Sequence, residues 1–209
     1  NPEADIGPQL EEIAAFNRSI ELPEAINDAK GMITSIENGV DRTVRIIKSL
    51  RNFSRLDEEK FKLADIHEGL ESTLEILRSQ IKKKAEVVKN YGEIPRIMCF
   101  PGKLNQVFMN LLSNAAQAID KPGAITVTTR MEGPDWVKIE IADTGTGMTP
   151  EVKDKIFDPF FTTKPVGKGT GMGLSITYKI IEEHEGKIEV ESELGEGTTF
   201  HIWIPARLE

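Results

Sequence analysis

Two glycine-rich segments most constrain how this chain can fold. One follows a pattern typical of a strand, and the other precedes a pattern typical of a helix. The first, DTGTG at residues 143–147, follows a run with alternating apolar residues at 137–141, which predicts a strand. The second, GKGTGMG at residues 167–173, precedes apolar residues with helical spacing at 174–181. Because glycine has no Cβ and tolerates positive φ, both segments can approach a ligand closely.

The second segment predicts a phosphate site, since free N–H groups and the helix dipole attract anions at the start of a helix. Lys164 and Lys168, with Thr162 and Thr163 beside them, can reach phosphate as point charges. The alternative for both glycine segments is a pair of ordinary turns.

Asp143 ends the predicted strand and offers a single carboxylate. A carboxylate accepts a hydrogen bond from an exocyclic amine such as that of adenine, whereas guanine presents a keto oxygen at the equivalent place. This chemistry favours ATP over GTP. The alternative is an aspartate that only caps a turn.

Residues 103–119 predict an amphipathic helix with a polar stripe at Gln106, Asn110, Asn114 and Gln117. Asparagine is unfavourable inside helices, so two of them four residues apart need a reason. Their amide oxygens suit Mg²⁺, directly or through water. The alternative is plain solvation of the helix surface, or hydrogen bonds to a neighbouring loop.

The region from residue 63 onward alternates between helical and strand patterns. It predicts an α+β fold, a two-layer α/β sandwich in which helices cover one face of a mixed β-sheet. The expected elements are a helix from about 66 to 77, short strands at 87–91 and 97–99, and hairpins of 124–131 with 136–142 and of 187–192 with 198–204.

The amino-terminal region predicts a long helix from Pro23 to about Leu56, with apolar residues three and four positions apart. This spacing is close to the 3.5-residue period of a helical bundle, so the stripe needs partner helices. We expect a homodimer through residues 23–56; the alternative is a monomer whose helix packs on the carboxyl-terminal domain. The expected domains are a helical dimerisation segment at 1–56, a linker at 57–62 and a second domain at 63–209.

Composition excludes several classes of protein. The net charge of −8 argues against nucleic acid as a partner, because phosphate backbones need a basic surface. The single cysteine, Cys99, excludes an internal disulfide, and no apolar run approaches the ~18 residues of a membrane span. The first residue is Asn1, so we expect a cytoplasmic fragment, attached to a membrane only through missing upstream segments.

Five segments, taken in order, resemble the nucleotide-binding boxes of sensor histidine kinases of two-component systems. They are the N-box at 110–115, the first glycine box at 143–147, the F-box at 157–161, the second glycine box at 169–174 and the last box at 195–200. Residues 50–55 more weakly resemble the end of the second dimerisation helix.

The resemblance implies a Bergerat ATP-binding fold with a mobile lid at about 145–172. It also implies transfer of the γ-phosphoryl group of Mg-ATP to a histidine, and then to an aspartate of a response regulator receiver domain. Asn110 and Asn114 would hold Mg²⁺. The expected ATP-binding residues are Asn110, Asn114, Asp143, Gly145, Gly147, Thr163, Lys164, Gly169, Thr170, Gly171, Met172, Gly173, Leu174 and Thr199.

The chain departs from the family in its histidines. It contains only His67, His184 and His201, and none precedes residue 56. We therefore name no certain catalytic residue, and expect the chain to bind ATP without phosphorylating itself at the usual place. The rival interpretations are an ATPase of the same fold, which generally carries glutamate in place of Asn110, a protein-serine kinase, or a scaffold that has lost activity.

Overall fold

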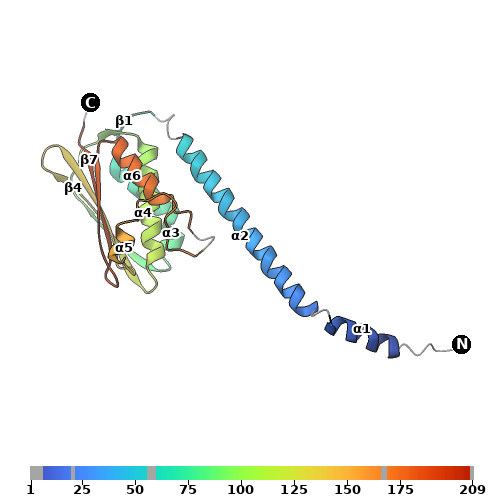
Figure 1. Ribbon diagram of the computed structural model, residues 1–209. Helices are drawn as coiled ribbons and strands as arrows, with labels where there is room; N and C mark the ends of the chain where they lie inside the picture. Colours follow the sequence, from blue (N-terminus) through green and yellow to red (C-terminus); the bar gives the residue numbers. More distant parts are fainter. Residues whose placement is uncertain (1–6, 20–21, 56–59, 166–168, 208–209) are drawn as a thin grey trace.

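A computed structural model describes residues 7–19, 22–55, 60–165 and 169–207. It has two parts, a pair of amino-terminal helices and an α/β domain (Figure 1). The helices are α1 (Gly7–Ser19) and α2 (Leu22–Arg55), so the long helix expected from the sequence is present. Pro23 lies in its first turn, where proline is tolerated because the missing N–H would have no partner there.

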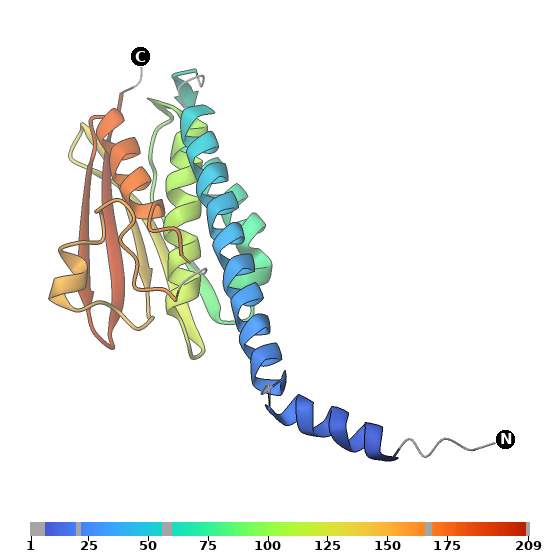
Figure 2. The ribbon, with the colours of Figure 1, turned by 45° about the vertical axis from the view of Figure 1, so that its right-hand side comes forward.

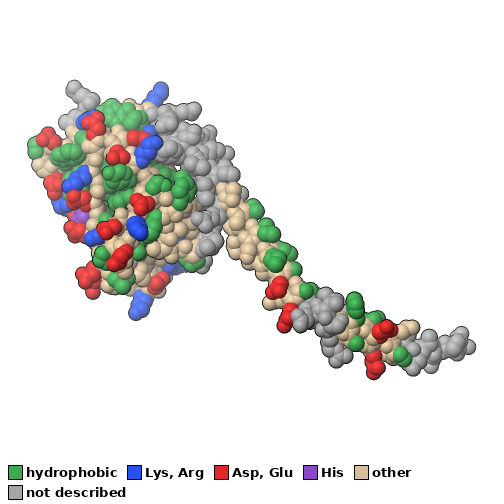
Figure 3. Space-filling view, viewed as in Figure 1, with side chains coloured by type: hydrophobic (Ala, Val, Ile, Leu, Met, Phe, Trp, Pro, Cys, Tyr) green, Lys and Arg blue, Asp and Glu red, His purple; other side chains and the backbone are tan. Residues whose placement is uncertain are grey.

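The apolar stripe of α2 is exposed between Ile26 and Val40, the part whose side chains the structure describes. Ile33 and Ile36 are 56% and 65% exposed, and apolar side chains follow one another along both helices in Figure 3. Helix α2 extends away from the α/β domain (Figure 1), so the alternative of a helix packed on that domain is not seen in the described residues. The stripe is therefore available to partner helices.

The α/β domain is built on a five-stranded mixed sheet in the order β2-β4-β5-β7-β6. The strands are β2 (Ala85–Tyr91), β4 (Gly123–Glu132), β5 (Trp136–Asp143), β6 (Lys187–Glu193) and β7 (Gly197–Pro205). Strand β2 is parallel to β4, and the remaining pairs are antiparallel. Both hairpins expected from the sequence are confirmed.

Helices cover one face of this sheet (Figure 2). They are α3 (Ile66–Ile81), α4 (Pro101–Ala118) and α6 (Gly173–Glu183), with a single turn, α5 (Pro150–Lys153), before α6. The core lies between the two layers, where Phe108 and Leu112 of α4 and Ile139 of β5 are fully buried. The opposite face carries charged side chains that pair with one another, such as Arg130 with Glu140. The predicted two-layer α+β fold is confirmed.

A second, two-stranded sheet was not expected. Strand β1 (Lys62–Ala64) pairs antiparallel with β3 (Ile97–Cys99), which the sequence predicted as a strand but not in this pairing. Lys62, placed at the end of the expected linker, begins β1; residues 57–59 of that linker lie outside the described residues. The ring of Phe61 lies 4.9 Å from that of Phe100, so the start of the domain rests on the residue that caps α4.

The turn between β6 and β7 contacts the end of β5 through backbone atoms. Gly197 has φ +105°, and a Cβ there would lie 2.0 Å from the carbonyl oxygen of Asp143. Gly147, with φ +64°, approaches the carbonyl oxygen of Glu193 in the same way. Glycine is required at both positions, and the contact fixes the end of β5.

Gly195 and Gly197 allow the cost of a positive φ to be measured apart from the cost of a steric clash. Gly195 also has a positive φ, +91°, but nothing lies within 4 Å of its Cβ position. We expect Gly195→Ala to lower the free energy of unfolding by about 1–2 kcal/mol. Gly197→Ala should cost about 1–3 kcal/mol more, because it adds a clash. Urea denaturation measures both, and equal losses would contradict the role given to the backbone contact.

Candidate functional site

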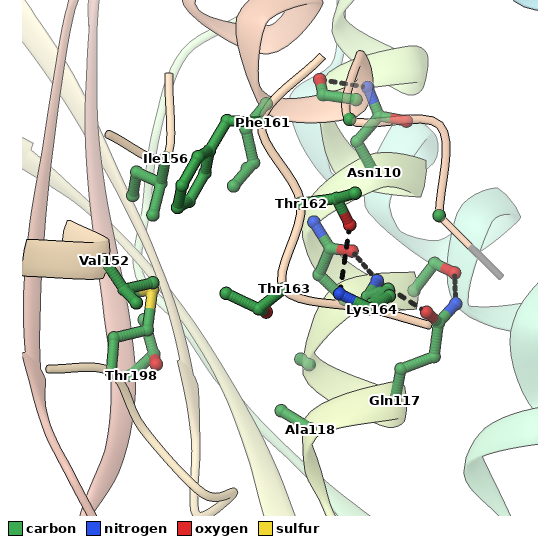
Figure 4. A pocket seen from close by; sticks show the side chains of 18 of the residues that line it. Asn110, Gln117, Ala118, Val152, Ile156, Phe161, Thr162, Thr163, Lys164 and Thr198 are labelled. Atoms are coloured by element: carbon green, nitrogen blue, oxygen red, sulfur yellow. Dashed lines mark hydrogen bonds between the residues drawn. The ribbon is translucent and has the colours of Figure 1, made fainter. Parts of the chain in front are cut away.

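A cavity of about 460 Å³ opens between α4, the end of β5, the segment 146–164 and the start of α6 (Figure 4). It brings together eleven of the fourteen residues expected to bind nucleotide. These are Asn110, Asn114, Asp143, Gly147, Thr163, Lys164, Gly169, Thr170, Gly171, Gly173 and Leu174. The two glycine segments and the asparagine stripe, which are far apart in sequence, thus meet at one place.

Three expected residues do not line the cavity. Gly145 lies behind Asp143 and donates its N–H to the Oδ1 of that residue at 2.8 Å, and Met172 caps the start of α6. Thr199 lies on β7 between Thr198 and Phe200, which do line the cavity. Side chains alternate along a strand, so Thr199 belongs to the other face of the sheet. Lys168 lies outside the described residues.

Asp143 is held at the end of β5 with 9% of its surface exposed. Burial raises the pKa of its carboxyl above the usual value, while backbone N–H groups of Gly145 and Thr198 act in the opposite direction. A Cβ at Gly145 would lie 2.6 Å from Oδ1, so the N–H contact needs glycine. The carboxylate is fixed in position and can accept a hydrogen bond from a ligand.

Asn110 and Asn114 use their amides differently. Asn110 donates from Nδ2 to the carbonyl oxygen of Gly173 at 2.9 Å and to Thr177 Oγ1 at 3.3 Å, which joins α4 to the first turns of α6. Asn114 Oδ1 accepts a hydrogen bond from Lys164 Nζ at 2.9 Å. Lys164 also donates to Gln117 Oε1 at 2.6 Å, and burial lowers the pKa of the lysine.

Asn110 and Asn114 fit Mg²⁺ better than a metal that takes all its ligands from protein side chains. Within the described residues, no group of three histidine, cysteine or acidic side chains could hold a metal ion. Two neutral carboxamides would leave most ligand positions to water and phosphate oxygens, which is how Mg²⁺ binds beside nucleotides. The two carboxamides therefore suit a metal that brings water and phosphate oxygens as its other ligands.

The start of α6 faces the cavity with no acidic residue in its first turn. Phe160 donates its N–H to the carbonyl oxygen of Gly171 at 2.8 Å, and Gly171 has φ +68° with its Cβ position 2.3 Å from the backbone of Phe160. This contact holds the glycine segment close to residue 160. The backbone N–H groups at the start of the helix can then bind an anion.

One wall of the cavity is apolar, and sequence reasoning missed most of it. It consists of Met148, Val152, Ile156, Phe161 and Phe200. Val152 and Ile156 are four residues apart around a short helix, a spacing that could have indicated a shared face. Of the three phenylalanines in the segment 157–161, Phe157 and Phe161 pack against the core, and Phe160 is 58% exposed.

The three histidines lie outside the cavity. His184 is buried, accepts the N–H of Phe100 at Nε2 and lies within 2.7 Å of the carbonyl oxygen of Ile180 at Nδ1. His201 pairs with Glu140 on the outer face of the sheet, and His67 stacks on Tyr91. These contacts give His184 and His201 roles in packing and pairing within the fold.

The profile of the histidine kinase-, DNA gyrase B- and HSP90-like ATPases matches residues 101–208, and the chain belongs to this family. It is 35% identical to the sensor kinase CckA of Brucella abortus over 192 residues, which cover 85% of this chain and 20% of CckA. The chain spans between 15% and 40% of the length of the curated relatives it matches.

Solved structures agree with this assignment. The catalytic domain of histidine kinase ThkA is 32% identical, with a TM-score of 0.63 over 71% of this chain and 97% of that domain. Full-length ShkA in complex with AMPPNP is 25% identical, with a TM-score of 0.70 over 84% of this chain and 38% of ShkA. The resemblance to sensor histidine kinases is thus confirmed. No described helix is both long and apolar enough to cross a membrane.

The raised pKa of Asp143 makes stability depend on pH. A carboxyl whose pKa is raised in the folded state stabilises the fold below its unfolded value, and this contribution is lost as pH rises through the folded value. Asparagine does not titrate. We therefore expect the unfolding free energy of Asp143→Asn, relative to the original protein, to rise as pH increases from about 3.8 toward neutrality. Urea denaturation at a series of pH values measures the difference; a constant difference would contradict the burial effect.

Proposed function

We propose that this chain carries the catalytic core of a two-component sensor histidine kinase. In this proposal the cavity binds Mg-ATP, and the γ-phosphoryl group passes to a histidine that is not present at the usual place in this chain, then to an aspartate of a response regulator receiver domain. The supporting observation is that a buried carboxylate, a helix start and a carboxamide pair border one cavity. The complex of the relative ShkA with AMPPNP also supports an ATP site.

Each part of the cavity has a chemical role in this proposal. Asp143 accepts a hydrogen bond from the adenine amine, and the apolar wall packs on the ring. The backbone at the start of α6 binds phosphate oxygens, where N–H groups and the helix dipole favour negative charge. The amide oxygens of Asn110 and Asn114 would hold Mg²⁺, which neutralises charge on the transferred group.

Transfer to a histidine is favoured over hydrolysis by the residues present. Hydrolysis benefits from a general base that activates water. The amide of Asn110 cannot take up a proton near neutral pH, and its Nδ2 is engaged by α6. Asp143 is the only carboxylate among the described residues that line the cavity, and it lies on β5, not on α4 beside the asparagine pair.

The exposed stripe of α2 supports a homodimer through residues 23–56, with the catalytic domain at 63–209 as a separate unit. Ile26, Ile33, Ile36 and Val40 recur at helical spacing and are all at least 47% exposed. A bundle with a second copy would bury them. We place the chain in the cytoplasm, where ATP and receiver domains are found; any membrane attachment would use other segments of the protein.

Calorimetry with Mg²⁺ and AMPPNP tests the nucleotide site. We expect Asp143→Asn to weaken binding about tenfold or more, because a neutral amide oxygen accepts a weaker hydrogen bond than a carboxylate and the amide nitrogen cannot accept one. Asn110→Ala should also weaken it. Thr199→Val, on the same strand as the cavity residue Thr198 but on the opposite face, is the matched control and should bind normally. Full affinity in both cavity variants would contradict the proposed site.

Labelled ATP tests the transfer. With Mg²⁺ and ATP labelled at the γ-phosphate, we expect no stable label on this chain alone and slow release of phosphate. Addition of a histidine-bearing dimerisation domain from a relative should produce acid-labile label on that domain. Fast hydrolysis without an acceptor would favour the ATPase interpretation. Acid-labile label on this chain would show that one of its own histidines accepts phosphate, and acid-stable label would favour the protein-serine kinase interpretation.

A further inference from the structure

The ammonium group of Lys164 lies between two carboxamide oxygens of α4. It donates to Asn114 Oδ1 at 2.9 Å and to Gln117 Oε1 at 2.6 Å. Gln117 Nε2 in turn donates to Ser113 Oγ at 2.9 Å, which fixes the orientation of the glutamine amide. Figure 4 shows these contacts joining the loop at Lys164 to helix α4 on one side of the cavity. A cation of the protein itself thus occupies the oxygen expected to serve a metal.

The ammonium group of Lys164 is held by neutral groups. Among the described residues, no carboxylate lies within salt-bridge distance of it, and its side-chain hydrogen bonds go to two amide oxygens. A hydrogen bond to a charged group is stronger than one between neutral groups. The contact therefore stabilises the arrangement in which Lys164 rests on α4.

The contact also confines the second glycine segment. A Cβ on Gly169 would lie 3.1 Å from Lys164 Cβ, 3.2 Å from Lys164 Cδ and 2.6 Å from Thr162 Oγ1. Thr162 Oγ1 also accepts the N–H of Lys164 at 3.2 Å. Gly169 therefore packs directly on the lysine stem, and movement of the lysine alters the space available to the segment that would bind phosphate.

We propose that Lys164 is an internal cation that competes with Mg-nucleotide for the Asn114 oxygen, and that Gln117 holds it in the competing position. This inference rests on the proposed nucleotide site. Binding then requires Lys164 to leave both oxygens, after which its charge is free to meet a phosphate. Gln117 stabilises only the nucleotide-free arrangement, so it opposes binding although it lines the cavity.

The direction in which one substitution changes the affinity for nucleotide tests the inference. Gln117→Leu removes an acceptor from Lys164 and leaves the lysine and both asparagines in place. We expect it to tighten binding of Mg²⁺-AMPPNP about threefold or more in calorimetry, because only the free state loses a hydrogen bond. Gln106→Leu, the same change on the same helix outside the cavity, should leave affinity unchanged. Weaker or unchanged binding by Gln117→Leu would overturn the inference.

A second readout observes the lysine itself. In ¹⁵N-labelled protein, a hydrogen-bonded ammonium exchanges protons slowly enough to give a Lys Nζ correlation, and Lys164→Met assigns it by loss. We expect this correlation in the free protein, and its loss or shift both in Gln117→Leu and on addition of Mg²⁺-AMPPNP. A correlation unchanged by the substitution would overturn the inference. Absence of nucleotide binding by the original chain would instead refute the proposed function.

Discussion

Burial of one side of α4 between the sheet and the neighbouring helices is the interaction on which the site depends. Leu104, Phe108, Leu111 and Leu112 are each at most 1% exposed. With 3.6 residues per turn, fixing these side chains inward also fixes the rotation of the helix about its axis. Asn110 and Asn114 are then carried to the flank of the helix, beside the cavity. The rotation of α4 about its axis therefore determines both which side chains enter the core and which side chains face the cavity.

The site contains groups that are unfavourable for the fold. Asp143 is a buried carboxyl whose pKa burial raises, and Lys164 is a partly buried ammonium whose pKa burial lowers. Both are less stable as charges inside the protein than in water. Their positions make sense for binding, since a ligand with an amine at one end and phosphates at the other would provide the missing partners. The two charges lower the stability of the fold, and they are the groups that the proposed nucleotide would contact.

Local patterns were enough to predict much of the fold. The helix at 101–118 and the two hairpins follow from apolar spacing alone. Pairings between distant segments were not predictable in this way. Strands β1 and β3 have three residues each, too few for a period, and the parallel contact of β2 with β4 depends on the helix between them. The contacts of Lys164 span 47 and 50 residues, which no local rule reaches. Thr199 was expected from a matched motif, and applying strand alternation would have placed it on the face away from the cavity.

Asn110 illustrates why a neutral side chain suits this place. Its nitrogen holds the carbonyl oxygen of Gly173, while its oxygen accepts no hydrogen bond among the described residues. A carboxylate of the same shape would attract a cation more strongly, yet it would have no proton to give to Gly173 and would repel that carbonyl. The junction of α4 with α6 would then come to rely on the metal. An amide joins the two helices without a metal, so this junction does not depend on what fills the cavity.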